Sequence, residues 1–329
     1  MNIKHTESRL MKSSTSICRK SRQIASAGLT KLLTIAFVCA LVGMNVNNAT
    51  AQMLLVSVDG NGSNIRSFNP TTGALLSATF ITGQQSPYQM ATEAGRIYTA
   101  QITTGSNVGI YSDTGSSLGS IATSARPIGV AVSGTNLYVA GFATNTVARH
   151  NAFTGALLNA NFITGFSGLR NLQVDGSGNI FVAAFGGTNN VTKWDSAGVA
   201  VAGFTTINLA SAIGLALNGN DLFVSNLNTT VSRYNATTGA LLNASFVTGL
   251  SSAAGMEVLN NTLYVASYGV GRVGTYNATT GAAINATFIT GLGNPTDVMF
   301  VIPEPSTSLM LMLGGLALML RQRHRAARV

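Results

Sequence analysis

The chain has 329 residues and a formal net charge of +9, yet only 9% of its residues are charged, far below the roughly 25% of typical soluble proteins. The excess positive charge lies at the two ends, because eight basic and eight acidic residues balance between Met53 and Val301. This distribution removes the electrostatic case for nucleic-acid binding. Both cysteines, Cys18 and Cys39, lie in the first 51 residues, so the rest of the chain offers no disulfide, thiolate nucleophile or cysteine metal site.

Residues 1–51 have the order of parts of a secretory signal peptide. A basic, Ser-rich region precedes the apolar run 32–44, and Ala49-Thr50-Ala51 then supplies the small-x-small pattern of a cleavage site at Ala49 and Ala51. The apolar run of 13 residues is short for a membrane span. We therefore expect export by the general secretory route.

The body of the chain repeats one motif, NATTGALLNASFVTG at residues 235–249. Close copies begin at Asn69, Asn151 and Asn277, and weaker copies begin at Ser112 and Asp195. The turn glycines of the six copies are 42, 40, 43, 41 and 42 residues apart (Gly73, Gly115, Gly155, Gly198, Gly239, Gly281). A fixed period in this range indicates a solenoid or propeller array.

Each period contains four short β-branched or aromatic stretches bounded by Gly, Asn, Ser or Thr, which is typical of four antiparallel strands. Four strands in about 42 residues correspond to one propeller blade. The body begins at a second strand, 53–58, and ends on a first strand, 295–301, so its two ends together complete a sixth blade. We predict an all-β, six-bladed β-propeller over residues 53–301. A β-solenoid is the rival architecture, although its period is usually shorter.

The strand runs of the body resemble a known group of repeats. PIGVAV at 127–132, NLYVA at 136–140 and VARHN at 147–151 are similar to NHL-type repeats and to six-bladed propellers of the lactonase and lyase superfamily. The resemblance covers about 250 residues and consists of strand hydrophobics, so it implies a fold rather than an activity.

One register of the innermost strands carries the polar candidates of the body. Aligning the blades places six residues in one column near the central channel (Gln89, Gly129, Asn171, Gly214, Gly255, Asp297). Six-bladed lactonases hold a divalent metal there, so the resemblance implies a calcium-type site at Asp297, Asn171 and Glu257 as one alternative. The other interpretation is that a few polar groups line the channel without a cofactor. His150 aligns with Phe68, Tyr234 and Tyr276, which favours a packing role.

The C-terminal residues 303–329 resemble the PEP-CTERM sorting signal of Gram-negative bacteria. Pro303-Glu304-Pro305 precedes the apolar stretch 307–320, and an Arg-rich tail, 321–329, ends the chain. We expect a short transmembrane helix whose basic flank stays in the cytoplasm (Arg321, Arg323, Arg325, Arg328). The resemblance implies processing near the Pro-Glu-Pro motif by a membrane exosortase and an association with extracellular polysaccharide. A simple C-terminal membrane anchor is the alternative.

Three functions remain open from the sequence. The first is an exported cell-surface or matrix propeller that acts as a non-catalytic binding or structural module. The second is a metal-dependent hydrolase or lyase that uses the channel. The third is a polysaccharide-binding module with Tyr88, Trp194 and Tyr268 at its rim.

Overall fold

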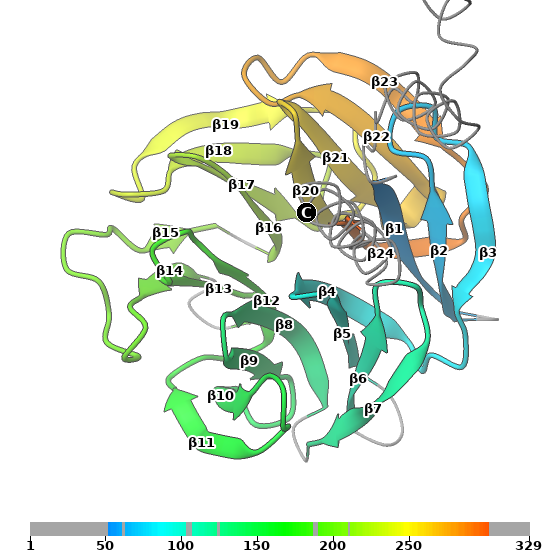
Figure 1. Cartoon of the computed structure of the whole chain (residues 1–329). Helices are drawn as coiled ribbons and strands as arrows, with labels where there is room; N and C mark the ends of the chain where they lie inside the picture. The colour runs from blue at the N-terminus through cyan, green and yellow to red at the C-terminus, as the bar shows by residue number, and fades with distance from the viewer. Residues whose placement is uncertain are drawn as a thin grey trace, which may run out of the picture. The chain divides into compact units, whose positions relative to one another are not determined.

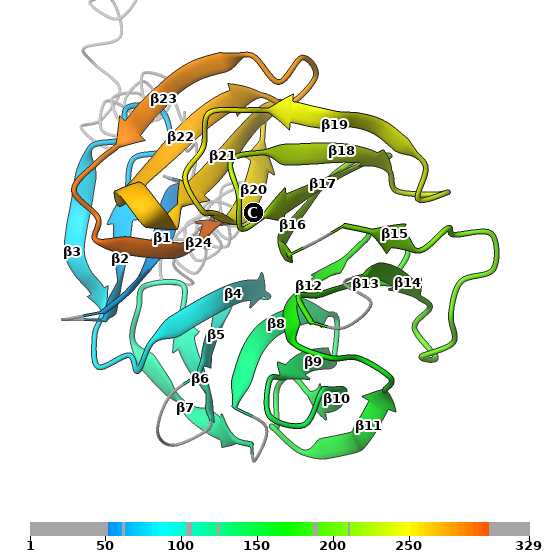
Figure 2. The same ribbon diagram turned by 180° about the vertical axis from the view of Figure 1, so that it is seen from behind.

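A computed structural model describes residues 52–60, 63–102, 107–123, 126–186, 190–209 and 211–302. Within these residues, twenty-four strands form six four-stranded antiparallel sheets, each built from strands that follow one another along the chain except in the sheet that joins both ends. The sheets are arranged as blades around a centre (Figures 1 and 2). This arrangement confirms the predicted six-bladed β-propeller.

The strands fall into four classes by their place in the blade. The innermost strands are β4 (Pro87–Glu93), β8 (Pro127–Ser133), β12 (Leu169–Val174), β16 (Ala212–Asn218), β20 (Ala253–Leu259) and β24 (Asn294–Val301). The second strands are β5 (Arg96–Gln101), β9 (Asn136–Gly141), β13 (Ile180–Ala184), β17 (Asp221–Asn226), β21 (Thr262–Ser267) and β1 (Met53–Asp59). The third strands are β6 (Asn107–Ser112), β10 (Thr146–Asn151), β14 (Asn190–Trp194), β18 (Val231–Asn235), β22 (Arg272–Asn277) and β2 (Asn64–Phe68). The outer strands are β7 (Ser117–Ala122), β11 (Leu157–Ile163), β15 (Ile207–Asn208), β19 (Leu241–Val247), β23 (Ala283–Ile289) and β3 (Leu75–Ile81).

The ring closes through one sheet that contains strands from both ends of the body. Its order is β24-β1-β2-β3, and β1 pairs antiparallel with β24 from Met53 opposite Val301 to Asp59 opposite Asn294. The closure therefore matches the prediction from the first and last strands of the body. Because both edges that would otherwise be free at the ends of the chain are paired, the ring has no open seam in its inner strands.

The hydrophobic core lies between neighbouring blades. Six clusters of buried side chains each combine residues of two adjacent sheets, for example Phe223 of one blade with Met256 and Leu263 of the next. The apolar positions of the second strand predominate in these clusters, and Tyr98, Tyr138, Phe181 and Phe223 are almost fully buried. Each blade therefore buries its faces only against its neighbours, as the repeat period predicts.

The repeated NxxTG motif forms the turn between the third and outer strands. In four blades the side-chain oxygen of the first Asn accepts hydrogen bonds from the backbone N–H groups two and three residues ahead (Asn69, Asn151, Asn235, Asn277). The turn Gly then has a positive φ, between 71° and 85° across the six blades. These Asx turns explain why the motif is repeated so faithfully.

The weak copy at Asp195 differs from the others in structure. Its outer strand, β15, has two residues, whereas β19 in the next blade has seven. Phe204 reaches its packing position against Phe181 from irregular backbone, with ring centroids 5.8 Å apart. The aromatic contact between the second strand and the outer segment of the same blade is therefore retained where the outer strand is shortened.

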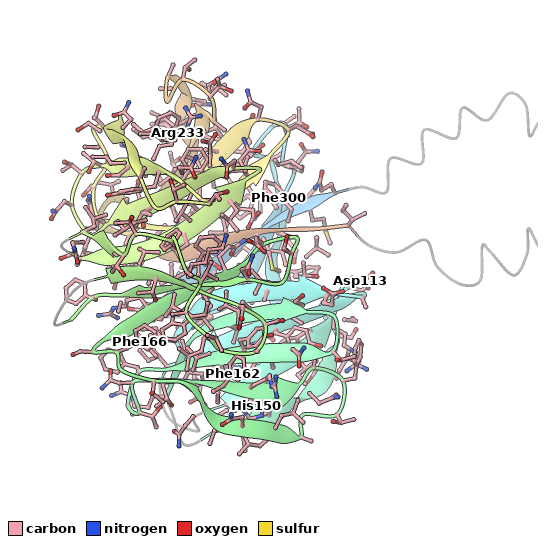
Figure 3. All side chains as sticks on the ribbon, turned by 90° about the vertical axis from the view of Figure 1, so that its left-hand side faces the viewer. Asp113, His150, Phe162, Phe166, Arg233 and Phe300 are labelled. Atoms are coloured by element: carbon pink, nitrogen blue, oxygen red, sulfur yellow. The ribbon has the colours of Figure 1, made fainter. Side chains whose placement is uncertain are left out.

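The six innermost strands all begin on one face of the ring, here called the start face, and all end on the other, the end face. Phe166, which precedes β12, and Asp113, which follows β6, lie at opposite faces when the ring is seen edge-on (Figure 3). Because β24 runs in the same sense as the other innermost strands, Val301 and the adjacent start of β1 lie on the end face.

Candidate functional site: the central channel

Every innermost strand is irregular at the same register. The pairing of each with its second strand shifts at the predicted polar column, between Pro87 and Met90 in β4 and at equivalent places in the other five blades. A bulge frees backbone groups from the ladder, and buried backbone groups need partners. The column is therefore where the channel must supply hydrogen bonds.

Side chains of the column supply several of those hydrogen bonds across blade boundaries. Gln89 Oε1 accepts from the backbone N–H of Val130 at 3.1 Å and of Leu172 at 3.0 Å, so that one side chain links three blades. Asp297 Oδ2 accepts from the N–H of Met90 at 2.8 Å and links the closing blade to the next. The structure thus confirms that Gln89 and Asp297 share one register and gives both of them a structural role.

The glycines of the column allow the inner strands to approach one another. A Cβ on Gly255 would overlap the carboxylate of Asp297, and one on Gly214 would overlap the backbone carbonyl oxygen of Ala254. A Cβ on Gly129 would lie 2.9 Å from the carbonyl oxygen of Arg170. Side chains at these positions would force the blades apart.

The channel holds two cavities, one opening toward each face. The start-face cavity has a volume of about 230 Å³, and its wall includes Tyr88, Arg170, Asn171, Tyr268 and Asp297. The end-face cavity, of about 210 Å³, is lined by the later halves of the inner strands and includes Glu257. Gln89 lines both and lies at the waist between them.

Arg170, in the wall of the start-face cavity, belongs to an alternating series of arginine and phenylalanine side chains. The guanidinium of Arg170 lies 5.3 Å from the ring centroid of Phe142 and 5.0 Å from that of Phe185. Arg126 lies 5.3 Å from the ring of Phe142, so this ring contacts two cations. We call these four residues the Arg–Phe ladder. Stacking of this kind fixes a planar guanidinium while leaving its edge available to a ligand.

Not every N–H group of the Arg170 guanidinium has a hydrogen-bond partner in this setting. Its Nε is buried without a hydrogen-bond acceptor, and burial lowers the pKa of the guanidinium, with Tyr88 opposing that shift. Burial also raises the pKa of Tyr88, while the positive charge of Arg170 acts in the opposite direction. Among the described residues, neither Arg126 nor Arg170 forms an ion pair; the two ion pairs found there are Lys193–Asp175 and Arg233–Asp221.

The repeat pattern alone does not distinguish Arg170 as a site residue. The available signal is its register, since it immediately precedes the column residue Asn171 and is charged, whereas the equivalent positions are Tyr88, Ile128, Ile213, Ala254 and Thr296. The stacking partners Phe142 and Phe185 follow the second strands of two different blades, and only the folded ring brings them to either side of Arg170.

The three residues of the predicted calcium-type site lie in two different cavities. Asn171 and Asp297 line the start-face cavity, and Glu257 lines the end-face cavity. Asn171 Oδ1 is buried without a hydrogen-bond partner, whereas one oxygen of Asp297 is bonded to Met90 N. No group of three or more His, Cys, Asp or Glu side chains suited to a metal occurs within the described residues. The start-face cavity therefore offers a divalent cation one carboxylate, Asp297, and the amides of Asn171 and Gln89, fewer than the six to eight oxygen ligands of Ca²⁺.

Both channel carboxylates are held toward their neutral forms. Burial raises the pKa of Glu257 to about 7. Burial likewise raises the pKa of Asp297 well above its ordinary value, and the charge of Glu257 adds to the effect although the N–H of Met90 opposes it. In its neutral form a carboxylic acid is a weak metal ligand, whereas it can still take part in structural hydrogen bonds.

The remaining candidates have separate positions. His150 is buried and pairs with Leu137 as Tyr234 pairs with Leu222, which confirms the aromatic packing register, and its Nδ1 lies 3.2 Å from the carbonyl oxygen of Gly155. Tyr88 and Tyr268 share the start-face cavity, whereas Trp194 packs edge-on against Phe166 and its Nε1 donates to Thr192. The structure therefore brings together two of the three predicted rim aromatics.

The predicted sorting residues lie outside the described part of the chain. These are the cleavage residues Ala49 and Ala51, the Pro303-Glu304-Pro305 motif, and the basic residues Arg321, Arg323, Arg325 and Arg328. Among the residues that the structure does describe, no helix is long and apolar enough to cross a membrane.

Solved structures similar to the chain support the fold. A chain of the crystal structure of a nidogen/laminin complex matches with a TM-score of 0.66 and 13% identity, covering 77% of this chain and all of that one. The crystal structure of a protein of unknown function from Bacteroides caccae matches with a TM-score of 0.59 and 19% identity, covering 76% of this chain and 99% of that one. Identities this low bear on the fold alone. A comparison with curated proteins found no match.

A family model locates the sorting signal. Residues 301–324 match the PEP-CTERM protein-sorting motif, whose first matched residue, Val301, is also the last residue of β24. The motif implies an exported protein that is anchored at the membrane before it is processed by an exosortase-type system. The chain is a six-bladed β-propeller that carries a PEP-CTERM protein-sorting motif.

Proposed function

We propose that the chain is an exported, exosortase-sorted propeller that acts as a non-catalytic binding module for acidic extracellular polysaccharide, held at the start-face cavity. The observation that carries this proposal is the Arg–Phe ladder, whose member Arg170 lines the cavity together with Tyr88 and Tyr268. Tyrosine rings offer apolar faces for sugar rings together with hydroxyl groups. A stacked guanidinium offers two parallel N–H groups to a carboxylate.

The chemistry of the cavity favours binding over turnover. Its carboxylate, Asp297, is buried and carries a raised pKa, and one of its oxygens accepts a hydrogen bond from Met90 N that links two blades, which supports a structural role for this group. Arg170, by contrast, is fixed by two aromatic rings and retains donor capacity. A pocket of this kind, concave and largely apolar with a few placed polar groups, is typical of ligand sites.

The proposal is tested by calorimetric titration of the purified chain with galacturonate oligosaccharides and with neutral malto-oligosaccharides of equal length. The acidic series is expected to bind and the neutral series to bind at least tenfold more weakly. Arg170→Gln is expected to weaken binding of the acidic series at least tenfold, since a hydrogen bond to a charged group contributes roughly 1.5–3 kcal/mol.

Arg149→Gln is the matched control. Arg149 also stacks on a phenylalanine, with its guanidinium 4.7 Å from the ring of Phe162, and its Nε is likewise buried without an acceptor. It does not line the start-face cavity. Equal binding by the Arg170→Gln variant and the unaltered chain would refute the proposal. Binding or product formation that is abolished by a chelator would instead favour the metal-dependent hydrolase.

A further inference from the structure

The point at which the chain leaves the propeller constrains how the ring can sit on a membrane. Val301 is the last residue of β24 and is buried, paired with Met53 in the ring. It is also the first residue of the match to the sorting motif. The folded ring and the sorting segment are therefore contiguous, and β24 is an innermost strand that ends on the end face.

Little chain separates the ring from the apolar stretch 307–320. Ile302 is the last described residue, and residues 302–306 span at most roughly 20 Å even when fully extended. The path around a blade is longer. Four strands spaced about 4.8 Å apart place the outer strand about 14 Å from β24, and a seven-residue strand adds about 23 Å from one face to the other. A tether that leaves the end face is thus too short to pass around the rim to the start face.

The N-terminal side of the ring gives the same constraint. Met53 lies directly opposite Val301 in the pairing of β1 with β24, so that the chain enters the ring beside the point where it leaves. Attachment to the membrane through either end would hold the same face toward the bilayer.

We propose that, while the sorting segment is in the membrane, the end face of the propeller lies on the bilayer surface and the start-face cavity opens away from it. The lipid surface then covers the mouth of the end-face cavity, and the Arg–Phe ladder is presented to the exterior. The orientation follows from the exit of β24 and the short tether, and it does not depend on the ligand assigned to the start-face cavity.

The test measures the distance of each face from the bilayer in the full chain reconstituted into liposomes. Cys18 and Cys39 are replaced by Ser, which leaves the chain without cysteine. Single cysteines are then introduced by Thr229→Cys and Thr238→Cys and labelled with a fluorescent donor, and the lipid headgroups carry the acceptor. Thr229 and Thr238 are exposed residues of the two turns that flank β18, so the two variants label the start face and the end face of one blade.

Energy transfer to the lipid acceptors is expected to be stronger from the donor at position 238 than from the donor at position 229, because the two positions are about 20 Å apart along the strand direction. Equal transfer from the two positions, or stronger transfer from position 229, would overturn the proposal. Circular dichroism melting of both variants shows that the comparison is made on folded rings. Insertion of 20 Gly/Ser residues between Ile302 and Pro303 is expected to remove the difference, because a flexible linker of that length frees the ring to rotate; a difference that persists would overturn the short tether as its cause.

The two proposals fail separately. A ring that lies with its end face on the bilayer but binds no acidic saccharide refutes the proposed function alone. A ring that binds the saccharide through Arg170 without a preferred orientation refutes the orientation alone.

Discussion

The turn glycines allow a quantitative prediction of how much the close contact between neighbouring blades contributes to the free energy of unfolding. Gly281, in the turn before β23, has φ +75°, and a Cβ there would overlap the backbone carbonyl oxygen of Phe246 in the preceding blade. Gly291, which follows β23, has φ +72°, and a Cβ there would meet nothing within 4 Å. The two glycines therefore share the conformational requirement and differ in the contact between blades.

Gly291→Ala is expected to lower the free energy of unfolding by about 1–2 kcal/mol, the cost of holding an L-residue in the left-handed region. Gly281→Ala carries the same cost and in addition must displace a backbone carbonyl of the neighbouring blade, which overpacking data place at a further 1–3 kcal/mol. At roughly 2–4 °C per kcal/mol for a body of this size, the melting temperature should fall by about 4 °C in the first variant and about 10 °C in the second.

The assay is thermal and urea unfolding of the purified chain followed by circular dichroism, with fluorescence of the single Trp194 as a second probe. Coincident transitions by the two probes would justify comparing free energies. If the two variants lose the same stability, the repeated glycine serves turn geometry alone, and the argument that it also sets the spacing between blades is wrong.

Two further predictions concern the channel waist. Gln89→Ala leaves the backbone N–H groups of Val130 and Leu172 without their shared acceptor and is expected to cost about 2–4 kcal/mol in unfolding free energy, measured by urea titration. Thr82→Ala, at an exposed position of the preceding loop, serves as the control and should cost about 0.5 kcal/mol or less. Burial in the folded state raises the pKa of Glu257 from 4.5 to about 7, so the native protein binds this proton more tightly than the unfolded chain does. The resulting stabilisation of the native state is fully present below about pH 4.5 and is lost as the pH rises to about 7. Glu257→Gln should remove that loss of stability, which amounts to up to about 3 kcal/mol. The assignment would be contradicted if the stability of this variant and of the unaltered chain had the same slope against pH between 4.5 and 7.

The fold could be predicted from the sequence because each blade is specified by short motifs that recur along the chain. The spacing of Gly73 to Gly281 defined the number of blades, and the NxxTG motif carries its own turn chemistry in the hydrogen bonds of each Asn side chain. The start at a second strand and the end on a first strand predicted the closure of the ring. The repeat was a poorer guide in the weak copy at Asp195, where the outer strand shrinks to Ile207–Asn208 although the contact of Phe204 with Phe181 is kept.

The site depended on contacts that no local pattern encodes. Alignment of the blades correctly placed Gln89, Asn171 and Asp297 in one column, but whether these side chains face a ligand or one another is decided by the bulges of the inner strands and by hydrogen bonds between residues as far apart as Met90 and Asp297. Glu257 lies two residues after the column residue Gly255 in β20, which runs toward the end face. Glu257 therefore lines the end-face cavity.

The architecture, the balanced charge of the body and the C-terminal sorting motif could thus be predicted without coordinates, because they follow from local patterns and from composition. The stacking of Arg170 between Phe142 and Phe185, the division of the channel into two cavities and the face on which β24 ends became visible only in the folded ring. Those features arise where separate blades meet, and their physical origin is the close packing of neighbours that the repeat makes obligatory but does not itself describe.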